Sequence, residues 1–273
     1  MKKLLLLAAA VVVLGLLALW WAIRAIPWDR VLQLPDSVEQ SLGDAYWESY
    51  AATAVLVEDP AVTVPVDALV DRIVEANGLT PPTVHIVESA EVNAFALPGN
   101  RLVLHTALLR EATSADEVAG VVAHELGHLA EGHVAQKLVK ELGLAAVVSL
   151  FLDGGAGGGM VVEAARTAVA TAFDRDMERE ADDRAVDYLL GAGIGVEGLA
   201  GFFDRLAAGE PVTWDGMSTH PDSAERAAAV RERGAAAAGP FTPALPEPAW
   251  AGLRAALPAY STTGWPYLPA NLR

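Results

Sequence analysis

The chain has 273 residues, a formal net charge of −16 at pH 7 and a hydrophobic content of 53%. This length is enough for one well-packed domain with an additional segment. The acidic balance argues against nucleic acid as a partner, because phosphate groups would be repelled. Since the chain contains no cysteine, it forms no disulfide bond, and any bound metal must be held by histidine and carboxylate side chains.

The N-terminus carries a long apolar run. No side chain from Leu4 to Ile23 is charged or polar, and Lys2 and Lys3 precede the run. As a helix, the run would span about 30 Å, the thickness of the hydrocarbon core of a bilayer. We expect residues 1–28 to form an uncleaved transmembrane signal anchor that places the rest of the chain outside the cytoplasm. A cleaved signal peptide is the alternative, although its apolar run is usually shorter.

Two helices are predicted after the anchor. The first covers Ser37–Leu56, and the apolar positions from Val66 to Val74 recur at the spacing of a second helix that ends at Gly78. Between them, Asp59–Val64 is expected to be a proline-bounded connection. These helices are predicted to serve packing rather than chemistry.

Three short apolar runs predict strands, which cover residues 83–87, 92–97 and 102–105. The turn residues Pro98-Gly99-Asn100 join the last two strands into a hairpin. His85 and His105 lie on these strands, and we expect them to be surface or hydrogen-bonded side chains rather than metal ligands. A small sheet backed by helices places the domain in the α+β class.

The motif HELGH at residues 124–128 is the strongest chemical signal in the chain. Four residues turn an α-helix by about 400°, so that His124 and His128 lie one turn apart on the same face. Two imidazoles placed in this way can share one tetrahedral Zn²⁺, with Glu125 beside them to act on a water molecule held by the metal. The sequence Ser114–Glu117 predicts a capping box at the start of this helix, and its apolar residues predict one buried face.

A catalytic zinc site usually has a third protein ligand. His133 is excluded by helical geometry, because it follows His124 by nine residues, or about 900°, and so lies on the opposite face. A helix predicted over Ala164–Leu190 offers carboxylates instead. Glu178 and Asp182 share a face of this helix, so that one can ligate the metal while the other accepts a hydrogen bond from a ligand imidazole. The competing carboxylates are Glu163, Glu180 and Asp183.

Four spaced segments together resemble one protein family. They are NAFALPG at 93–99, HELGH at 124–128, RDMEREAD at 175–182 and STHP at 218–221, with Arg226 beyond the last. The chain is therefore similar to the HtpX-like and BepA-like zinc metallopeptidases. These HExxH…ExxAD gluzincins also include Oma-type and CAAX prenyl endopeptidases. Several motifs in one order are far more specific than HExxH alone.

The resemblance implies a role for each site residue. It implies one Zn²⁺ per subunit held by His124, His128 and Glu178, with Glu125 as the catalytic glutamate and Asp182 supporting a ligand imidazole. The resemblance also implies that an exposed strand binds substrate, since such a strand can pair with an extended peptide through main-chain hydrogen bonds. The residues of this strand are Asn93, Ala94, Phe95 and Ala96.

His220 is a further candidate catalytic residue, just before a helix predicted over Asp222–Gly234. The resemblance implies that its loop approaches the metal. Two roles are open. The imidazole can occupy the open metal position and hold the enzyme inactive, or it can donate a hydrogen bond to the oxyanion during hydrolysis.

The resemblance implies a membrane-anchored zinc metalloendopeptidase that acts on unfolded or misassembled envelope proteins. The alternative is a membrane-anchored chaperone or binding module with a zinc site and little or no proteolysis. The expected location is the bacterial inner membrane, with a single span and the catalytic domain on the periplasmic side. We expect a zincin-type metallopeptidase domain at 35–238 and a Pro- and Ala-rich tail at 239–273, following the anchor at 1–28.

Overall fold

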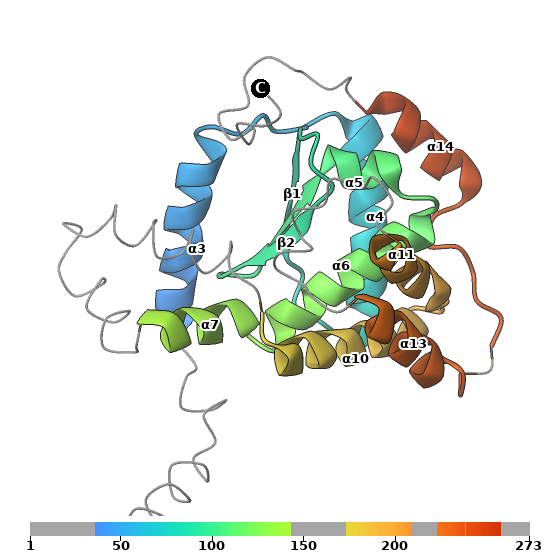
Figure 1. The fold of residues 1–273 in the computed structure, drawn as a ribbon. Coiled ribbons are helices and arrows are strands. Elements are labelled where there is room, and N and C mark those ends of the chain that lie inside the picture. Colours follow the sequence, from blue (N-terminus) through green and yellow to red (C-terminus); the bar gives the residue numbers. More distant parts are fainter. Residues whose placement is uncertain (1–35, 143–172, 209–222, 238, 258–273) are drawn as a thin grey trace, which may run out of the picture.

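The computed structural model describes residues 36–142, 173–208, 223–237 and 239–257. The predicted anchor at 1–28, His220 and Glu163 lie outside these residues. In the part of the chain that is described, no helix is both long and apolar enough to cross a membrane. The domain is mainly helical and contains a small mixed sheet (Figure 1), which agrees with the predicted α+β class.

The sheet contains β1 (Thr83–Val87), β2 (Ala94–Leu97) and β3 (Arg101–His105) in the order β1-β3-β2. Strands β2 and β3 pair antiparallel, with Phe95 opposite Val103, and this confirms the predicted hairpin. Gly99 and Asn100 have φ values of 74° and 56° in its turn, a conformation that glycine and asparagine tolerate best. Strand β1 pairs with β3 in parallel. Strand β2 is therefore left at an edge of the sheet.

Helices cover both faces of this sheet (Figure 1). Helix α3 (Asp36–Ala51) covers one face, while α4 (Pro60–Asn77) and α6 (Ala115–Ala130) lie on the other. The strands divide their side chains accordingly, because successive residues of a strand point to opposite faces. Val103 packs with Tyr46 of α3, whereas Leu102 and Leu104 join the main core with α4 and α6.

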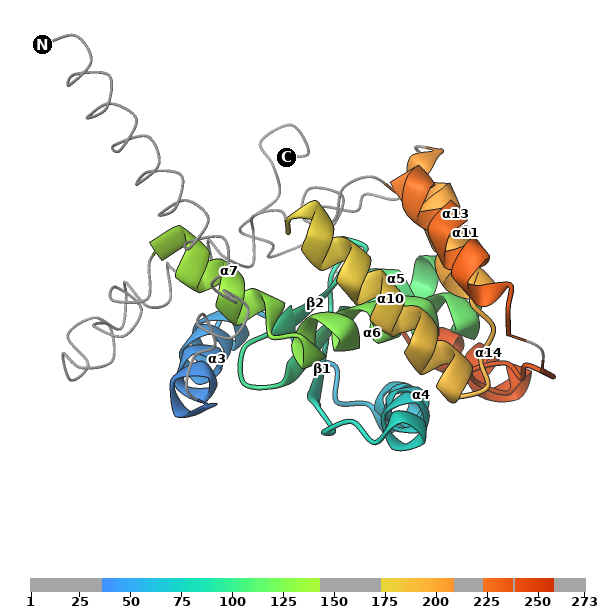
Figure 2. The same ribbon diagram turned by 90° about the horizontal axis from the view of Figure 1, so that it is seen from below.

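Helix α6 is the centre of the domain. The predicted single buried face is an underestimate, because nearly every residue from Ala115 to His128 is buried. Helices α10 (Arg175–Gly191) and α11 (Glu197–Ala207) pack against it on the side away from the sheet (Figures 1 and 2). The other helices in the described part of the chain are α5 (Thr106–Glu111), α7 (His133–Leu142), α13 (Ser223–Gly234), which packs on α10 and α11, and α14 (Glu247–Ala256), which packs on α4.

One predicted helix start is wrong and one predicted helix is not continuous, and in both cases an aspartate marks the start of the observed helix. Helix α4 begins at Pro60, inside the segment predicted as a connection, because Asp59 accepts a hydrogen bond from the amide of Ala61 and proline fits the first helical position. The predicted helix over Ala164–Leu190 does not run through residues 173 and 174: α10 begins at Arg175, where Asp174 accepts a hydrogen bond from the amide of Met177, and residues 164–172 lie outside the described residues. Helix α3 also ends earlier than predicted, at Ala51.

Candidate metal centre and active site

Side chains fix the start of helix α6 and so position the HELGH motif. Ser114 Oγ accepts a hydrogen bond from the amide of Glu117 at 3.2 Å, as the predicted capping box requires. The Glu117 carboxylate departs from that prediction, because it accepts hydrogen bonds from the amide and hydroxyl of Thr113 rather than from Ser114. Its other oxygen pairs with Arg205 of α11. The start of α6 is thereby tied to a neighbouring helix.

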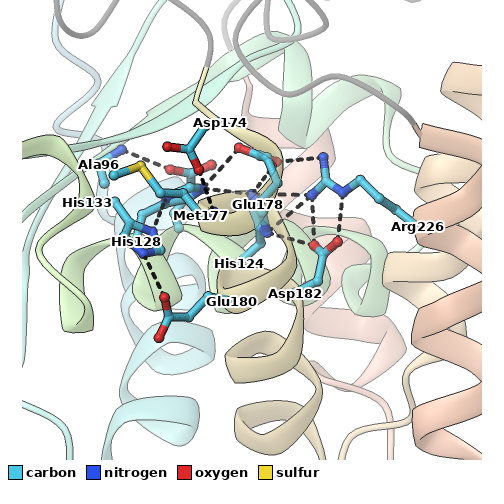
Figure 3. Close-up of polar contacts among 11 residues, drawn as sticks. Ala96, His124, His128, His133, Asp174, Met177, Glu178, Glu180, Asp182 and Arg226 are labelled. Carbon is cyan, nitrogen blue, oxygen red and sulfur yellow. Dashed lines mark hydrogen bonds and ion pairs between the residues drawn. The ribbon is translucent and has the colours of Figure 1, made fainter. Parts of the chain in front are cut away.

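The three predicted metal ligands converge between α6 and α10 (Figure 3). The Nε2 atoms of His124 and His128 are 3.1 Å apart. The carboxylate oxygens of Glu178 lie 3.6 Å from His124 Nε2 and 3.5 Å from His128 Nε2. All three side chains are buried, and their ligand atoms lie within 4.8 Å of one another. The structure therefore brings together the group that the motifs indicated.

Asp182 and Arg226 contact the ligand side chains of His124 and Glu178 and hold them in place. Asp182 Oδ1 lies 3.0 Å from His124 Nδ1, which is the imidazole nitrogen turned away from the ligand group. Arg226 of α13 donates two hydrogen bonds of 2.7 Å to the same carboxylate and also lies 2.7 Å from Glu178 Oε2. Burial alone would raise the pKa of Asp182, but the hydrogen bonds from Arg226 and His124 outweigh it and hold the pKa below its usual value.

The donor set and the charge of this cluster fit a divalent metal ion. Two imidazole nitrogens and one carboxylate oxygen are the protein ligands of many catalytic metal sites. Glu125, Glu178 and Asp182 are buried, with exposed fractions of 2%, 2% and 6%, and Arg226 is exposed by 5%. These three carboxylates outnumber the one guanidinium that pairs with two of them. A buried net charge is costly, so a divalent cation would stabilise this arrangement.

Glu125 faces the edge strand of the sheet. Its Oε2 accepts a hydrogen bond of 3.0 Å from the amide of Ala96. The carbonyl of Asn93 accepts a hydrogen bond from the amide of His105 on β3. Because the backbone groups of successive residues in an antiparallel strand point alternately toward and away from the partner strand, the N–H and C=O of Ala96 point away from β3. The predicted base and the predicted substrate strand are therefore within hydrogen-bonding distance of each other.

The other predicted substrate residues fall on different sides of β2. Ala94 joins the core that contains α6, whereas the ring of Phe95 makes edge-to-face contacts with Tyr50 of α3 and with His105. Asn93 precedes the strand and donates a hydrogen bond to Glu91. Only Ala94 and Ala96 thus lie on the metal side. His105 is buried and hydrogen-bonded to Tyr50, in agreement with the prediction of a hydrogen-bonded side chain.

His133 lies beside the metal centre, and sequence reasoning missed its position. The geometric argument against it was wrong because the helix is not continuous: α6 ends at Ala130, Gly132 has a φ of 64°, and α7 begins at His133. His133 Nδ1 is 2.9 Å from His128 Nδ1. Burial lowers the pKa of His133 to about 4, which keeps the ring neutral at neutral pH. Gly132 after a helical run was the signal for this break.

The competing carboxylates lie away from the ligand group. Asp183 pairs with Arg233 of α13 at 3.2 Å, and Glu180 Oε2 lies 3.5 Å from His133 Nε2. Neither belongs to the group of three ligands in the described residues. Glu163 and His220 lie outside those residues, so that their roles stay predictions.

A helix-borne HExxH motif completed by a glutamate from a second helix defines a zincin-type, metal-dependent peptidase site. The model of Peptidase family M48 matches residues 60–234, and the chain belongs to this family. The predicted resemblance to BepA-like and Oma-type peptidases is therefore confirmed.

Named relatives give the same class of protein. The chain is 31% identical over 183 residues to the beta-barrel assembly-enhancing protease of Yersinia pestis, covering 62% of this chain and 37% of the relative. Metalloprotease LoiP of Escherichia coli is 35% identical over 159 residues, covering 56% and 63%. Mitochondrial metalloendopeptidase OMA1 of Arabidopsis thaliana is 33% identical over 142 residues, covering 52% and 29%. The chain thus matches less than two thirds of each relative's length. Family and names together support a metalloendopeptidase.

Proposed function

We propose that this protein is a zinc metalloendopeptidase that cleaves unfolded or misassembled envelope proteins. The convergence of His124, His128 and Glu178 beside Glu125 carries the proposal. Two imidazoles and a carboxylate, without thiolates, suit zinc in a catalytic site that leaves one position open. Envelope proteins are proposed as substrates because relatives bear the name beta-barrel assembly-enhancing protease.

Each residue of the site has a separate role in peptide hydrolysis. When bound, zinc would supply a Lewis acid that polarises the scissile carbonyl and lowers the pKa of the attacking water. The Glu125 carboxylate takes a proton from that water and delivers it to the leaving amine. The Ala96 amide orients this carboxylate through its 3.0 Å hydrogen bond. Asp182 fixes the ring of His124, and Arg226 holds both Asp182 and Glu178 in place.

Strand β2 offers a surface for an extended peptide. Among the described residues it pairs with β3 alone, and its other side faces Glu125. A substrate added to this edge would bind through main-chain hydrogen bonds, which give affinity with little sequence preference. The small side chains of Ala94 and Ala96 lie on the metal side of the strand. These features suit a peptidase that acts on unfolded chains of varied sequence.

The alternative, a chaperone or binding module with a zinc site, is disfavoured by Glu125. A metal that only stabilises the fold needs no carboxylate next to its ligands, and burying one is costly. Glu125 is nevertheless buried, with 2% of its surface exposed.

The test is a digestion assay on the full chain purified in detergent, with an unfolded protein such as casein as the probe and metal content measured in parallel. Glu125→Gln should retain the metal and the fold but lose turnover by roughly 10²–10⁴-fold, since only proton transfer is removed. Glu178→Ala should lose both metal and activity. Asp183→Asn is the matched control, because Asp183 lies on the same helix but pairs with Arg233 at the surface. Digestion by Glu125→Gln at the wild-type rate would refute the proposal.

We further propose that residues 1–28 anchor the protein in the bacterial inner membrane with the catalytic domain in the periplasm. The uncharged run from Leu4 to Ile23 after two lysines supports this location. Membrane fractionation combined with N-terminal sequencing of the mature protein tests it. A mature protein that begins near Trp28 would identify a cleaved signal peptide and contradict the anchor.

A further inference from the structure

A contact between two buried histidines lies next to the metal centre. The Nδ1 atoms of His128 and His133 are 2.9 Å apart, and the exposed fractions of the two residues are 0% and 1%. Two ring nitrogens at this distance form a hydrogen bond in which one donates and the other accepts. The direction of the bond is therefore decided by which nitrogen carries the proton.

The metal site settles this direction. His128 Nε2 faces His124 Nε2 and Glu178 (Figure 3), so it must keep its lone pair in order to bind a metal. A neutral imidazole with a free Nε2 carries its proton on Nδ1. His128 Nδ1 must then donate, and His133 Nδ1 must accept.

The same reasoning fixes the proton of His133. If its Nδ1 accepts, a neutral His133 carries its proton on Nε2. That nitrogen lies 3.5 Å from Oε2 of Glu180 on α10 (Figure 3). A carboxylate at this place favours a nearby N–H over a lone pair, because opposite charges attract. The two contacts of His133 are therefore consistent with one tautomer only.

We propose that His133 is a positioning residue that fixes the tautomer and ring orientation of the metal ligand His128, with Glu180 stabilising the required tautomer of His133. Phe173 contributes separately, because its ring stacks on His128 with centroids 4.1 Å apart and an interplanar angle of 28°. Lys137 of α7 lies over the Phe173 ring, with Nζ 4.2 Å from the ring centroid. Stacking fixes the plane of an imidazole but leaves both tautomers open, so the hydrogen bond to His133 is needed to select one.

The break between α6 and α7 is what makes this contact possible. In a continuous helix, residues five apart differ by about 500°, which would turn His133 away from His128. Gly132, with its φ of 64°, breaks the helix, and His133 stands at the start of α7. The inference rests on the proposed metal centre, but it does not depend on which substrate is cleaved.

Zinc affinity is the first test, measured by competition with a chelator on the full chain carrying Glu125→Gln, so that proteolysis does not enter the result. His133→Leu removes the acceptor and should weaken zinc binding by about 10–100-fold, the usual cost of losing a group that orients a metal ligand. His133→Asn retains an oxygen acceptor near the position of Nδ1 and should restore most of the affinity. A folded His133→Leu variant with wild-type zinc affinity would overturn the proposal.

The tautomers can be read directly without changing His133, which covers the case in which His133→Leu does not fold. In the zinc-loaded chain with ¹⁵N-labelled histidines, NMR should show a protonated Nδ1 on His128 and a protonated Nε2 on His133. The opposite assignment would overturn the proposal. Normal tautomers and zinc affinity without any proteolysis would contradict the proposed function instead, so the two failures are distinguishable.

A double-mutant cycle tests the part of Glu180. Glu180→Ala should weaken zinc binding, by less than His133→Leu does, and it should have no further effect when combined with His133→Asn, which has no nitrogen at the Nε2 position. Asp176→Ala is the matched control, since this side chain is 90% exposed on the same helix and pairs with Arg179. Equal zinc affinities for the Glu180 and Asp176 variants would refute the role of Glu180.

Discussion

Helices α6 and α10 approach each other closely at Gly127, which lies between the two histidine ligands. A Cβ atom added at Gly127 would lie 2.8 Å from the carbonyl oxygen of Ala181 and 3.1 Å from its Cα atom. Both are backbone atoms of α10, between Glu178 and Asp182 in the sequence. We therefore expect Gly127→Ala to push α10, with its metal ligand, away from α6.

The size of the effect follows from these distances. Ordinary van der Waals contact begins at 3.4 Å, so the Ala181 oxygen must retreat by about 0.6 Å. Overpacking of this kind costs about 1–3 kcal/mol, of which the higher helix propensity of alanine returns about 1 kcal/mol. We expect a net loss of roughly 0–2 kcal/mol in unfolding free energy. The displacement exceeds the tolerance of about 0.5 Å for a preorganised site, so metal affinity should fall more clearly, by about tenfold or more.

The assay compares urea unfolding of the metal-free protein with zinc affinity measured by chelator competition. Gly201→Ala is the control, because Gly201 lies inside helix α11 and a Cβ there meets no atom within 4 Å. This variant should gain up to about 1 kcal/mol and bind zinc normally. If Gly127→Ala behaves like Gly201→Ala in both measurements, close packing of the two helices does not position the ligands.

Three further changes give distinct outcomes. Arg226→Met should destabilise the metal-free protein by about 3–5 kcal/mol in urea unfolding, because it removes the guanidinium that pairs with the buried carboxylates of Asp182 and Glu178, whereas Arg233→Met at the surface should cost less than about 1 kcal/mol. Burial lowers the pKa of His105 to about 4. The unfolded chain therefore binds this proton more readily, and stability should fall by up to about 3 kcal/mol as the pH drops from 6.5 to 4. A His105→Gln variant with the same pH dependence as wild type would contradict this. His220→Ala should raise proteolysis if His220 is a resting-state ligand and lower it by about 10²–10³-fold if it is an oxyanion donor; unchanged kinetics would exclude both.

The sequence predicts best what depends on neighbours within one helix. HELGH places His124 and His128 on one face by helical periodicity alone, and the same rule pairs Glu178 with Asp182. The hairpin of β2 and β3 was equally accessible, because its turn residues are local signals. The choice of Glu178 as third ligand needed the family resemblance, since several carboxylates on that helix were open to the same reading.

The features that the sequence did not predict depend on contacts between distant segments or on the residues that start and end helices. Parallel pairing of β1 with β3 has no local signature. Pro60 was placed in a proline-bounded connection, although Asp59 makes it the start of α4. His133 was placed on a continuous helix, although Gly132 ends that helix. In both helical cases a short-range stop or start signal was present and was given too little weight against the apolar pattern.

The role of Arg226 shows how charge joins three helices into one site. Helix α10 brings two carboxylates, Glu178 and Asp182, into a buried place next to the imidazoles and the Glu125 carboxylate of α6. Without α13, these carboxylates would lose the guanidinium that pairs with both of them before metal binds, which is costly. Arg226 offsets part of that cost by pairing with both carboxylates of α10, so that the ligands can be held in position in advance. The carboxylates still outnumber this guanidinium, and a divalent ion would offset their charge. The ExxAD segment and the arginine beyond STHP therefore act as a single electrostatic unit, although 44 residues separate Asp182 from Arg226.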